Sequence, residues 1–408
     1  LLGVSFGHSV LRRVSEILRS QLLKQEQCYI GDGGLFYLVS WDVSKEKVES
    51  RLKELIEKIQ AGDCAQGKYN IQLSAGAYWH LINKENVGEG TLSLSSVSLP
   101  AMDSLIDTDS HWPENFFTKA RAALKQLKIS NKGGVRFFDD NLAEKIRTEK
   151  LLENNFQQAL ENNEFVLYYQ PKYGIKGAEP ELHGAEALIR WISPEYGFLS
   201  PGRFIPLFER DGNLEILDRH VLKLACQQLR QWLDAGYQAV PISVNISRRN
   251  IVGGNNFLAY ALDVLAEYQI PTNLIQLEIL ETDASVDSKL LIKFLQTFKS
   301  SGFSLAMDDF GSGYSSLGMF NFMPIDCLKL DKSFFDSWQP DMSERDSCLI
   351  KYMIKAAHDT GRTVVAEGIE EKFQVDLLRQ YDCDMIQGYY FSKPLPAEDF
   401  ASKMHKRL

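Results

Sequence analysis

The stretch "FSLAMDDFGSGYSSL" (303–317) joins a short apolar run to two adjacent acids and a loop of small residues. The run Phe303–Met307 predicts a buried strand, and Asp308 and Asp309 follow at the point where that strand leaves the core. Asp and Gly are common turn formers, so a solvated turn would explain the stretch if it stood alone. The rest of the chain decides between a turn and a functional site.

Strands and helices alternate from about residue 163 onward. The strand candidates are "FVLYYQ" (165–170), "HGAEALIRW" (183–191), "PISVN" (241–245), "LIQLEI" (274–279), "FSLAMD" (303–308), "CLKLD" (327–331), "TVVAE" (363–367) and "DMIQGYYF" (384–391). Helical stretches separate most of them, at 214–234, 286–300, 344–359 and 371–380. Eight strand–helix units of this size predict an α/β fold of the TIM-like (β/α)8 barrel type. A doubly wound open sheet is the alternative, but it seldom needs eight such units.

The first part of the chain has a different pattern. Its expected strands are 28–31 and 35–40, joined as a hairpin around Asp32-Gly33-Gly34, followed by 69–79 and 134–138. Its expected helices are 9–25, 43–60 and 116–128, and residues 79–112 read as a loop. We therefore predict a small α/β domain over residues 1–140, a helical linker over 141–162 and the barrel over 163–408, which fits the two domains expected for 408 residues.

Charge and cysteine usage exclude several classes of protein. The net charge is −9 with the acids spread along the chain, which argues against broad binding to a nucleic acid polymer or an anionic membrane. The six cysteines are scattered without a C-x-x-C pair, which indicates reduced thiols in the cytoplasm. No apolar run approaches the ~20 residues of a transmembrane helix, and no signal peptide is visible. The chain opens on "LLGVSF" without Met, which leaves open that it is the cytoplasmic part of a longer, membrane-anchored protein.

Polar side chains stand at or near the carboxyl ends of seven predicted strands. They are Glu186, Asn245, Glu278, Asp308 with Asp309, Lys329, Glu367 and Gln387. In a parallel barrel these ends converge on one mouth, where active sites are built. Five carboxylates packed there without counter-ions would repel one another and raise each other's pKa.

Such an oxygen-rich set suits Mg²⁺ or Mn²⁺, and two ions about 3.5–4 Å apart are the usual clamp for in-line displacement at phosphorus. The adjacent acids Asp308 and Asp309 could serve both ions. The histidines show no H-E-x-x-H spacing, which argues against a zinc peptidase. The sequence therefore favours a two-metal site over a solvated turn.

At this point the ordered motifs resemble the EAL-domain phosphodiesterases, which linearise bacterial cyclic di-GMP. "EALIRW" (186–191) is similar to the family's signature. The other matching segments are "YYQPK" (168–172), "SVNIS" (243–247), "LEILE" (277–281), "DDFGSGYSSL" (308–317), "LKLDKSF" (328–334), "VAEGIE" (365–370) and "QGYYFSKP" (387–394). The resemblance covers about residues 150–405 and implies an EAL-type barrel.

The resemblance implies a role for each site residue. One metal would be bound by Glu186, Asn245, Glu278 and Asp308, and the second by Asp308, Asp309 and Glu367. The implied catalytic residues are Lys329, Glu281 and Glu367. Lys329 would orient the attacking water or offset charge on the phosphoryl oxygens, and Glu281 would hold the loop after the paired acids.

Four further residues would surround the substrate. Arg190 would pair with the non-scissile phosphate, while Gln170, Leu188 and Gln387 would line the pocket for guanine and sugar. Glu370 would contact residues that bind the metals or the substrate without binding either itself. Each also has a plain structural reading: Arg190 as the partner of a neighbouring acid, Leu188 as core, and Glu370 as an acid at a helix start.

One departure from the family pattern stands out. Leu280 replaces the usual Thr between the two acids of "LEILE", so a hydroxyl near the metals is lost but no ligand is. We expect retained but altered activity. Residue 280 shares a strand face with Glu278, because side chains alternate along a strand.

The first part resembles a degenerate, N-terminally truncated GGDEF domain, the cyclase-like fold often placed before an EAL domain. "GHSVLRRVSEIL", "LSAGA" and "ARAALKQLKISNKGGVRFF" resemble its helices and strands. The motif Gly-Gly-Asp-Glu-Phe here reads Asp32-Gly33-Gly34-Leu35-Phe36, so Gly34 and Leu35 replace the acids. We expect a non-catalytic regulatory or dimerisation module; the resemblance leaves open GTP or protein contact there, and we expect a homodimer.

The resulting functional prediction is a metal-dependent phosphodiesterase that converts cyclic di-GMP to linear pGpG. The alternative is a catalytically silent receptor that binds cyclic di-GMP and signals to a protein partner. Receptors of this kind usually have a broken EAL or Asp-Asp motif, and both are intact here. A scaffold that ignores the nucleotide is a weaker third option.

Overall fold

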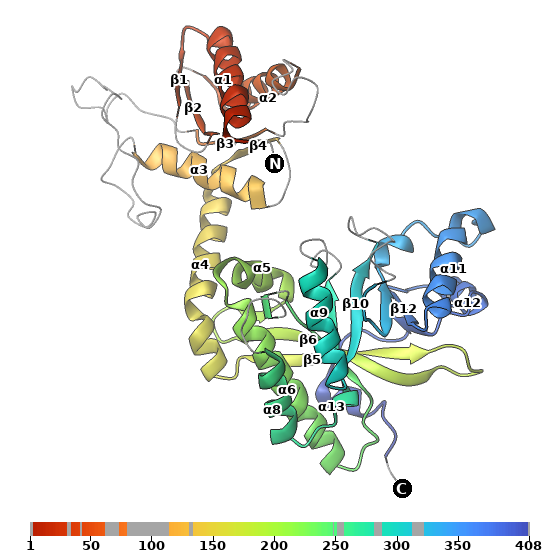
Figure 1. Ribbon diagram of the computed structural model, residues 1–408. Coiled ribbons are helices and arrows are strands. Elements are labelled where there is room, and N and C mark those ends of the chain that lie inside the picture. The colour runs from red at the N-terminus through yellow and green to blue at the C-terminus, as the bar shows by residue number, and fades with distance from the viewer. Residues whose placement is uncertain are drawn as a thin grey trace. The chain divides into compact units, whose positions relative to one another are not determined.

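The structure is a computed structural model that describes residues 3–30, 34–40, 43–61, 73–79, 114–129, 134–247, 249–250, 257–280, 288–311 and 322–406. The chain falls into two compact units, Leu1–Thr148 and Glu149–Leu408, which we describe separately (Figure 1).

The first unit contains two strand pairs with helices. Its elements are α1 (Gly3–Gln21), β1 (Glu26–Ile30), β2 (Phe36–Ser40), α2 (Lys45–Ala61), β3 (Ser74–Ala77), α3 (Glu114–Ile129), β4 (Gly134–Phe137) and the start of α4 (Asp140–Glu161). The strands β1 and β2 form the predicted antiparallel hairpin, and β3 pairs with β4 in parallel. A small core forms where α1 and α2 bury Val14, Leu18, Leu55 and Ile59. The cyclase-like identity of this unit stays a prediction.

The second unit contains the strand–helix alternation expected from the sequence. Its strands are β5 (Phe165–Gly174), β6 (Glu181–Ser193), β7 (Gly197–Leu199), β8 (Ile242–Asn245), β9 (Ile275–Leu280), β10 (Ser304–Phe310), β11 (Cys327–Leu330), β12 (Thr363–Glu367), β13 (Met385–Gln387) and β14 (Leu395–Pro396). Its helices are α5 (Pro201–Asp211), α6 (Leu214–Asp234), α8 (Phe257–Glu267), α9 (Ser288–Ser300), α11 (Glu344–Asp359), α12 (Lys372–Gln380) and α13 (Ala397–Ala401), with the single turns η5 (Thr272–Leu274) and η7 (Lys332–Phe334).

Eight of these strands close into a barrel in the order β5-β6-β8-β9-β10-β11-β12-β13, because β5 pairs with both β6 and β13. The prediction of an eight-stranded barrel is therefore confirmed. One feature differs from a fully parallel barrel: β5 runs antiparallel to β6 and to β13. The physical reason is the connection, since a short hairpin joins β5 directly to β6 where the pattern suggested a strand–helix unit.

The last barrel strand is also shorter than predicted. The apolar run 384–391 reads as one strand, but β13 ends at Gln387. A Cβ on Gly388 would collide with the backbone of Ile369, so this close approach requires glycine where the chain turns away from the barrel.

The apolar core lies between the barrel strands and the outer helices. On β9, for example, Leu277 and Ile279 belong to this core, whereas Gln276 and Glu278 face the barrel interior and contact Lys172. The densest packing joins rings from α4, β5, β6 and α5, with Phe165 against Trp191 at 5.0 Å between ring centroids. This alternation directs the polar residues of each strand into the barrel.

Among the described helices, none has the length and apolar character needed to span a membrane.

Candidate active site

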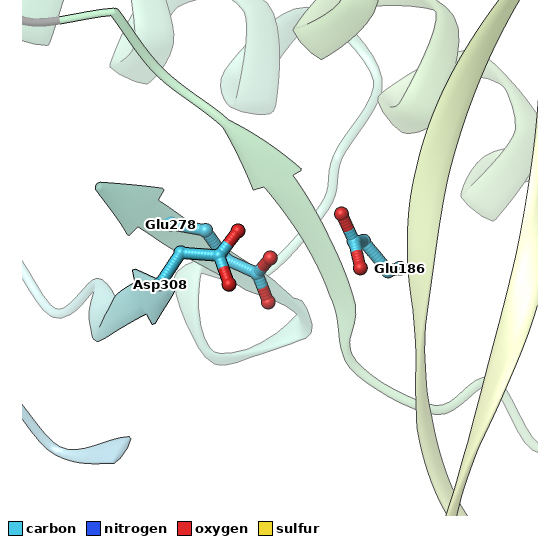
Figure 2. Close-up of side chains that lie close together, drawn as sticks. All are labelled: Glu186, Glu278 and Asp308. Atoms are coloured by element: carbon cyan, nitrogen blue, oxygen red, sulfur yellow. The ribbon is translucent and has the colours of Figure 1, made fainter. Parts of the chain in front are cut away.

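Three buried carboxylates converge inside the barrel mouth. Glu186 comes from β6, Glu278 from β9 and Asp308 from β10, and Figure 2 shows the three side chains gathered from separate strands. Each offers an oxygen within 4.8 Å of the others. We call this set the first acidic group. Residues far apart in the sequence thus share one site, as the strand-end argument predicts.

A second acidic group consists of Asp308, Asp309 and Glu367, whose oxygens also lie within 4.8 Å of one another. Asp308 belongs to both groups. In a regular strand, Asp309 would point away from Asp308, because successive side chains alternate. The register of β10 against β11 shifts between Met307 and Phe310, and Asp309 has a positive φ of 52°. This bulge brings both adjacent acids to the same site.

The Lys329 ammonium lies at the centre of the carboxylates. Its Nζ is 2.6 Å from Glu278 Oε2, 2.8 Å from Asp308 Oδ1, 2.7 Å from Glu367 Oε1 and 3.3 Å from Glu186 Oε2. The side chain is fully buried on β11. It therefore offsets part of the repulsion among four carboxylates.

The pKa values of these acids reflect burial and this shared cation. Burial raises the pKa of Asp308 to about 7 and that of Glu367 to about 8, although Lys329 opposes both shifts. Burial would also raise the pKa of Glu278, but Lys172 and Lys329 outweigh it and lower that pKa to about 2. The raised pKa values of Asp308 and Glu367 therefore follow mainly from burial, which the Lys329 charge only partly offsets.

Lys172 is a buried site residue that the sequence analysis left without a role. Its Nζ donates to Glu278 Oε1 at 2.6 Å and to Ser243 Oγ at 2.6 Å. A signal was present, since Lys172 stands two residues after Gln170 and must share its strand face. Even with this second cation, the described part of the site places five carboxylates near two ammonium groups.

Two amide side chains orient Glu186, and a third contacts one of them. Asn245 Nδ2 donates to Glu186 Oε1 at 2.8 Å, and Gln387 Nε2 donates to Glu186 Oε2 at 2.6 Å. Gln387 Nε2 also donates to Gln170 Oε1 at 3.2 Å. Gln170 reaches this layer because its strand is antiparallel and pairs it with Glu186. The guanine pocket predicted for Gln170 and Gln387 stays a prediction.

Leu188 and Arg190 follow Glu186 on the same face of β6, and both are half-buried. The guanidinium of Arg190 lies over the ring of Tyr168 at 5.6 Å, and burial lowers its pKa from the ordinary value. The group stays cationic at neutral pH because an Arg pKa starts above 12. Its position near the barrel mouth fits an anionic ligand.

One other predicted residue, Glu370, stands apart from this cluster. Glu370 is exposed, and its Oε1 pairs with Lys332 Nζ at 3.0 Å. Glu281 lies outside the described residues, so its predicted role in holding the loop stays a prediction. Leu280 is 41% exposed at the end of β9, in register with Asp308.

The two acidic groups fit divalent cations in their chemistry. Their donors are all carboxylate oxygens, the ligands that Mg²⁺ and Mn²⁺ prefer, and Asp308 joins the two groups. The raised pKa values of Asp308 and Glu367 are those of acids that a bound cation would keep ionised.

The family model of the EAL domain matches residues 153–394, within the second unit. The chain belongs to the EAL domain family. The EAL signature residues 186–188 lie on β6, with Glu186 in the first acidic group.

Several EAL relatives and solved structures are similar to this chain. It is 34% identical to the cyclic di-GMP phosphodiesterase NbdA of Pseudomonas aeruginosa over 72% of its own length and 37% of NbdA. It is 33% identical to the oxygen sensor protein DosP of Escherichia coli, over 71% of the chain and 36% of DosP. The PaMucR phosphodiesterase in complex with c-di-GMP superposes with a TM-score of 0.56 at 31% identity, over 61% of this chain and 99% of that one. The chain thus spans little more than a third of the curated relatives named here.

Proposed function

We propose that the barrel hydrolyses cyclic di-GMP to linear pGpG and requires Mg²⁺ or Mn²⁺. The observation that carries this proposal is the convergence of two acidic groups on the mouth of an EAL barrel, with Asp308 common to both. The named activity of NbdA and the ligand in the PaMucR complex support the same substrate.

In this proposal the first acidic group and Asn245 hold one cation, and the second acidic group holds the other. Two divalent cations at such a site lower the pKa of water and offset charge that develops on phosphoryl oxygens. The chain's own amides, Asn245 and Gln387, keep the Glu186 carboxylate oriented through bonds to its two oxygens.

Lys329 and Arg190 supply fixed positive charge to the substrate. Lys329 is placed among the carboxylates, where its ammonium offsets negative charge as the phosphoryl oxygens approach. Arg190 binds the phosphate that is not cleaved, since a planar guanidinium can donate two parallel hydrogen bonds to it. Leu188 packs beside the nucleoside.

The experiment is incubation of the protein with cyclic di-GMP and either Mg²⁺ or Mn²⁺, followed by chromatography. We expect linear pGpG in both reactions and none after addition of a chelator. Glu186→Ala is the control, since it removes one member of the first acidic group. Tight binding of cyclic di-GMP without product would overturn the proposed hydrolysis and favour the alternative of a catalytically silent receptor.

We further propose that the first unit is a non-catalytic GGDEF-like module with a regulatory role. The hairpin β1–β2 and the surrounding motifs support this assignment. A homodimer through the barrel is supported by Leu349 and Tyr352 on α11, which are 60% and 63% exposed. A cytoplasmic location is supported by the free thiols of the five described cysteines.

A further inference from the structure

The single turn η7 (Lys332–Phe334) follows β11 directly and contacts both neighbouring strand ends. In the barrel, β11 lies between β10 and β12. Those two strands carry all three members of the second acidic group, Asp308, Asp309 and Glu367. The turn therefore follows the strand that lies between the two strands carrying these carboxylates.

On the β10 side, the ring of Phe334 packs against the backbone of Gly311. Gly311 has a φ of +96°, which glycine adopts without strain, and a Cβ there would collide with the Phe334 ring. Gly311 stands two residues after Asp309, at the end of the bulge. The ring thus covers the segment whose unusual backbone turns Asp309 into the site.

On the β12 side, the stem of Lys332 packs against Gly368, the residue after Glu367. Gly368 has a φ of +64°, and a Cβ there would lie 2.6 Å from both Cβ and Cγ of Lys332. The ammonium of the same lysine pairs with Glu370 Oε1 at 3.0 Å. One side chain therefore contacts two of the residues that directly follow β12.

The turn is itself held firmly. The Oδ1 of Asp331 accepts a hydrogen bond from Ser333 N at 3.0 Å, which caps the turn. The next residue, Phe335, is 1% exposed in the main core, and its N donates to Lys332 O at 2.8 Å. Phe334 and Lys332 thus project from a fixed point.

We propose that the η7 turn positions the second acidic group, with Phe334 and Lys332 as positioning residues for cation binding. This inference rests on the proposed function, because it requires the second acidic group to bind a cation. Asp309 has a positive φ, which is uncommon for a non-glycine residue although less so for Asp, and contacts from outside the strand would stabilise it. Phe334 supplies that support through Gly311.

The first test measures Mn²⁺ binding to the full chain by electron paramagnetic resonance, without substrate. We expect two sites in the unmodified protein. Phe334→Ala should weaken one of them about 10–100-fold, the range seen when outer-shell supports are removed, and leave the other unchanged. Phe294→Ala is the matched control, because Phe294 is also a half-buried core phenylalanine but lies on α9.

The second test is a double-mutant cycle with Gly311→Ala. The single variant should lose affinity at the same Mn²⁺ site, because the new methyl group collides with the ring. Adding Phe334→Ala should restore part of that loss, since the collision disappears while the backbone strain remains. If Gly311→Ala fails to fold, Phe334→Leu replaces it and should bind Mn²⁺ with an affinity between those of the unmodified protein and Phe334→Ala.

The outcomes separate this inference from the proposed function. A protein that binds no Mn²⁺ and makes no pGpG would overturn the proposed function. If the protein binds two Mn²⁺ ions but Phe334→Ala binds them as tightly as Phe294→Ala, the positioning role is wrong. Strictly additive losses in the double variant would also overturn it.

Discussion

Lys329 Nζ lies 2.6 Å from Glu278 Oε2, and the two side chains are 1% and 0% exposed to solvent. The same ammonium contacts Asp308, Glu367 and Glu186. The Lys329 ammonium therefore holds together carboxylates from four strands. Replacing this lysine tests its contribution to both the activity and the stability of the barrel.

Lys329→Met should abolish most pGpG production and also destabilise the cation-free protein. Removing one partner of a buried ion pair typically costs about 3–5 kcal/mol, because the other partner stays buried and uncompensated. Thermal unfolding in EDTA should show a clear drop in midpoint, and Mn²⁺ should restore part of it. An unchanged midpoint in EDTA would contradict the counter-charge role.

Asp308→Asn should lower turnover by at least ~10³, since this residue is the one shared by both acidic groups. The fold should survive, because the change removes one of several like charges. Turnover is measured by pGpG formation and the fold by far-ultraviolet circular dichroism. Near-normal turnover would show that Asp308 binds no cation.

Leu280→Thr should alter turnover by less than ~10-fold. Leu280 is exposed and pairs in register with Asp308, so a hydroxyl there could reach the site without displacing any described carboxylate. Since one hydrogen bond contributes only about 0.5–1.5 kcal/mol, the new hydroxyl should change the activation free energy by no more than that amount. If the unmodified protein makes no pGpG and Leu280→Thr does, Leu280 would be the reason that the barrel is inactive.

The first unit should make no cyclic di-GMP from GTP. Gly34 and Leu35 stand where the cyclase motif has acids, and neither side chain can bind a metal. The assay incubates the Glu186→Ala variant with GTP and Mg²⁺. This variant is used because it should not hydrolyse any cyclic di-GMP that the first unit makes. Detection of cyclic di-GMP would refute this prediction, whereas an effect of GTP on hydrolysis rate would agree with it.

Asp384→Asn should destabilise the barrel at neutral pH but not in acid. Burial opposes ionisation of Asp384, but bonds from Lys176, His358 and Val364 outweigh it and lower its pKa. A lowered pKa stabilises the fold above the unfolded value of about 3.9, and the benefit is lost as the pH falls through the folded value. Unfolding midpoints in EDTA should therefore differ at pH 7, and the difference should shrink in acid as the pH falls through the folded-state pKa of Asp384.

Asp382→Asn is the control for this prediction, because Asp382 contacts the same lysine but its side chain is 69% exposed. Its midpoint should stay close to that of the unmodified protein at neutral pH and in acid. Equal losses for the two variants would mean that the Asp384 contacts contribute little.

Much of the barrel could be predicted because its helices and strands have strong periodicity. The predicted helices 214–234 and 344–359 coincide with α6 and α11. The antiparallel direction of β5 could not be predicted, because side chains alternate with a period of two in parallel and antiparallel strands alike. The stretch 79–112, read as a loop, lies almost wholly outside the described residues.

The strand-end argument predicted carboxylates that the structure places close together, but it did not predict how two of them reach the same site. It placed Asp308 and Asp309 at one mouth, yet alternation alone would separate them. The positive φ of Asp309 belongs to a bulge in β10, and no local pattern around 308–309 encodes it. The prediction gave Lys172 no role because the first predicted strand ended at Gln170, whereas β5 continues to Gly174 and carries Lys172 into the barrel.

The pairing of β5 with β13 and β14 has a consequence for how the chain is synthesised. The first barrel strand leaves the ribosome more than 200 residues before the partners that close it, Met385–Gln387 and Leu395–Pro396. Until then, one edge of β5 is an open template for wrong pairing, and such long-range closure is slow. Gln387 arrives on the same late segment, so a nascent chain that stops short of it has neither a closed barrel nor a complete set of bonds to Glu186.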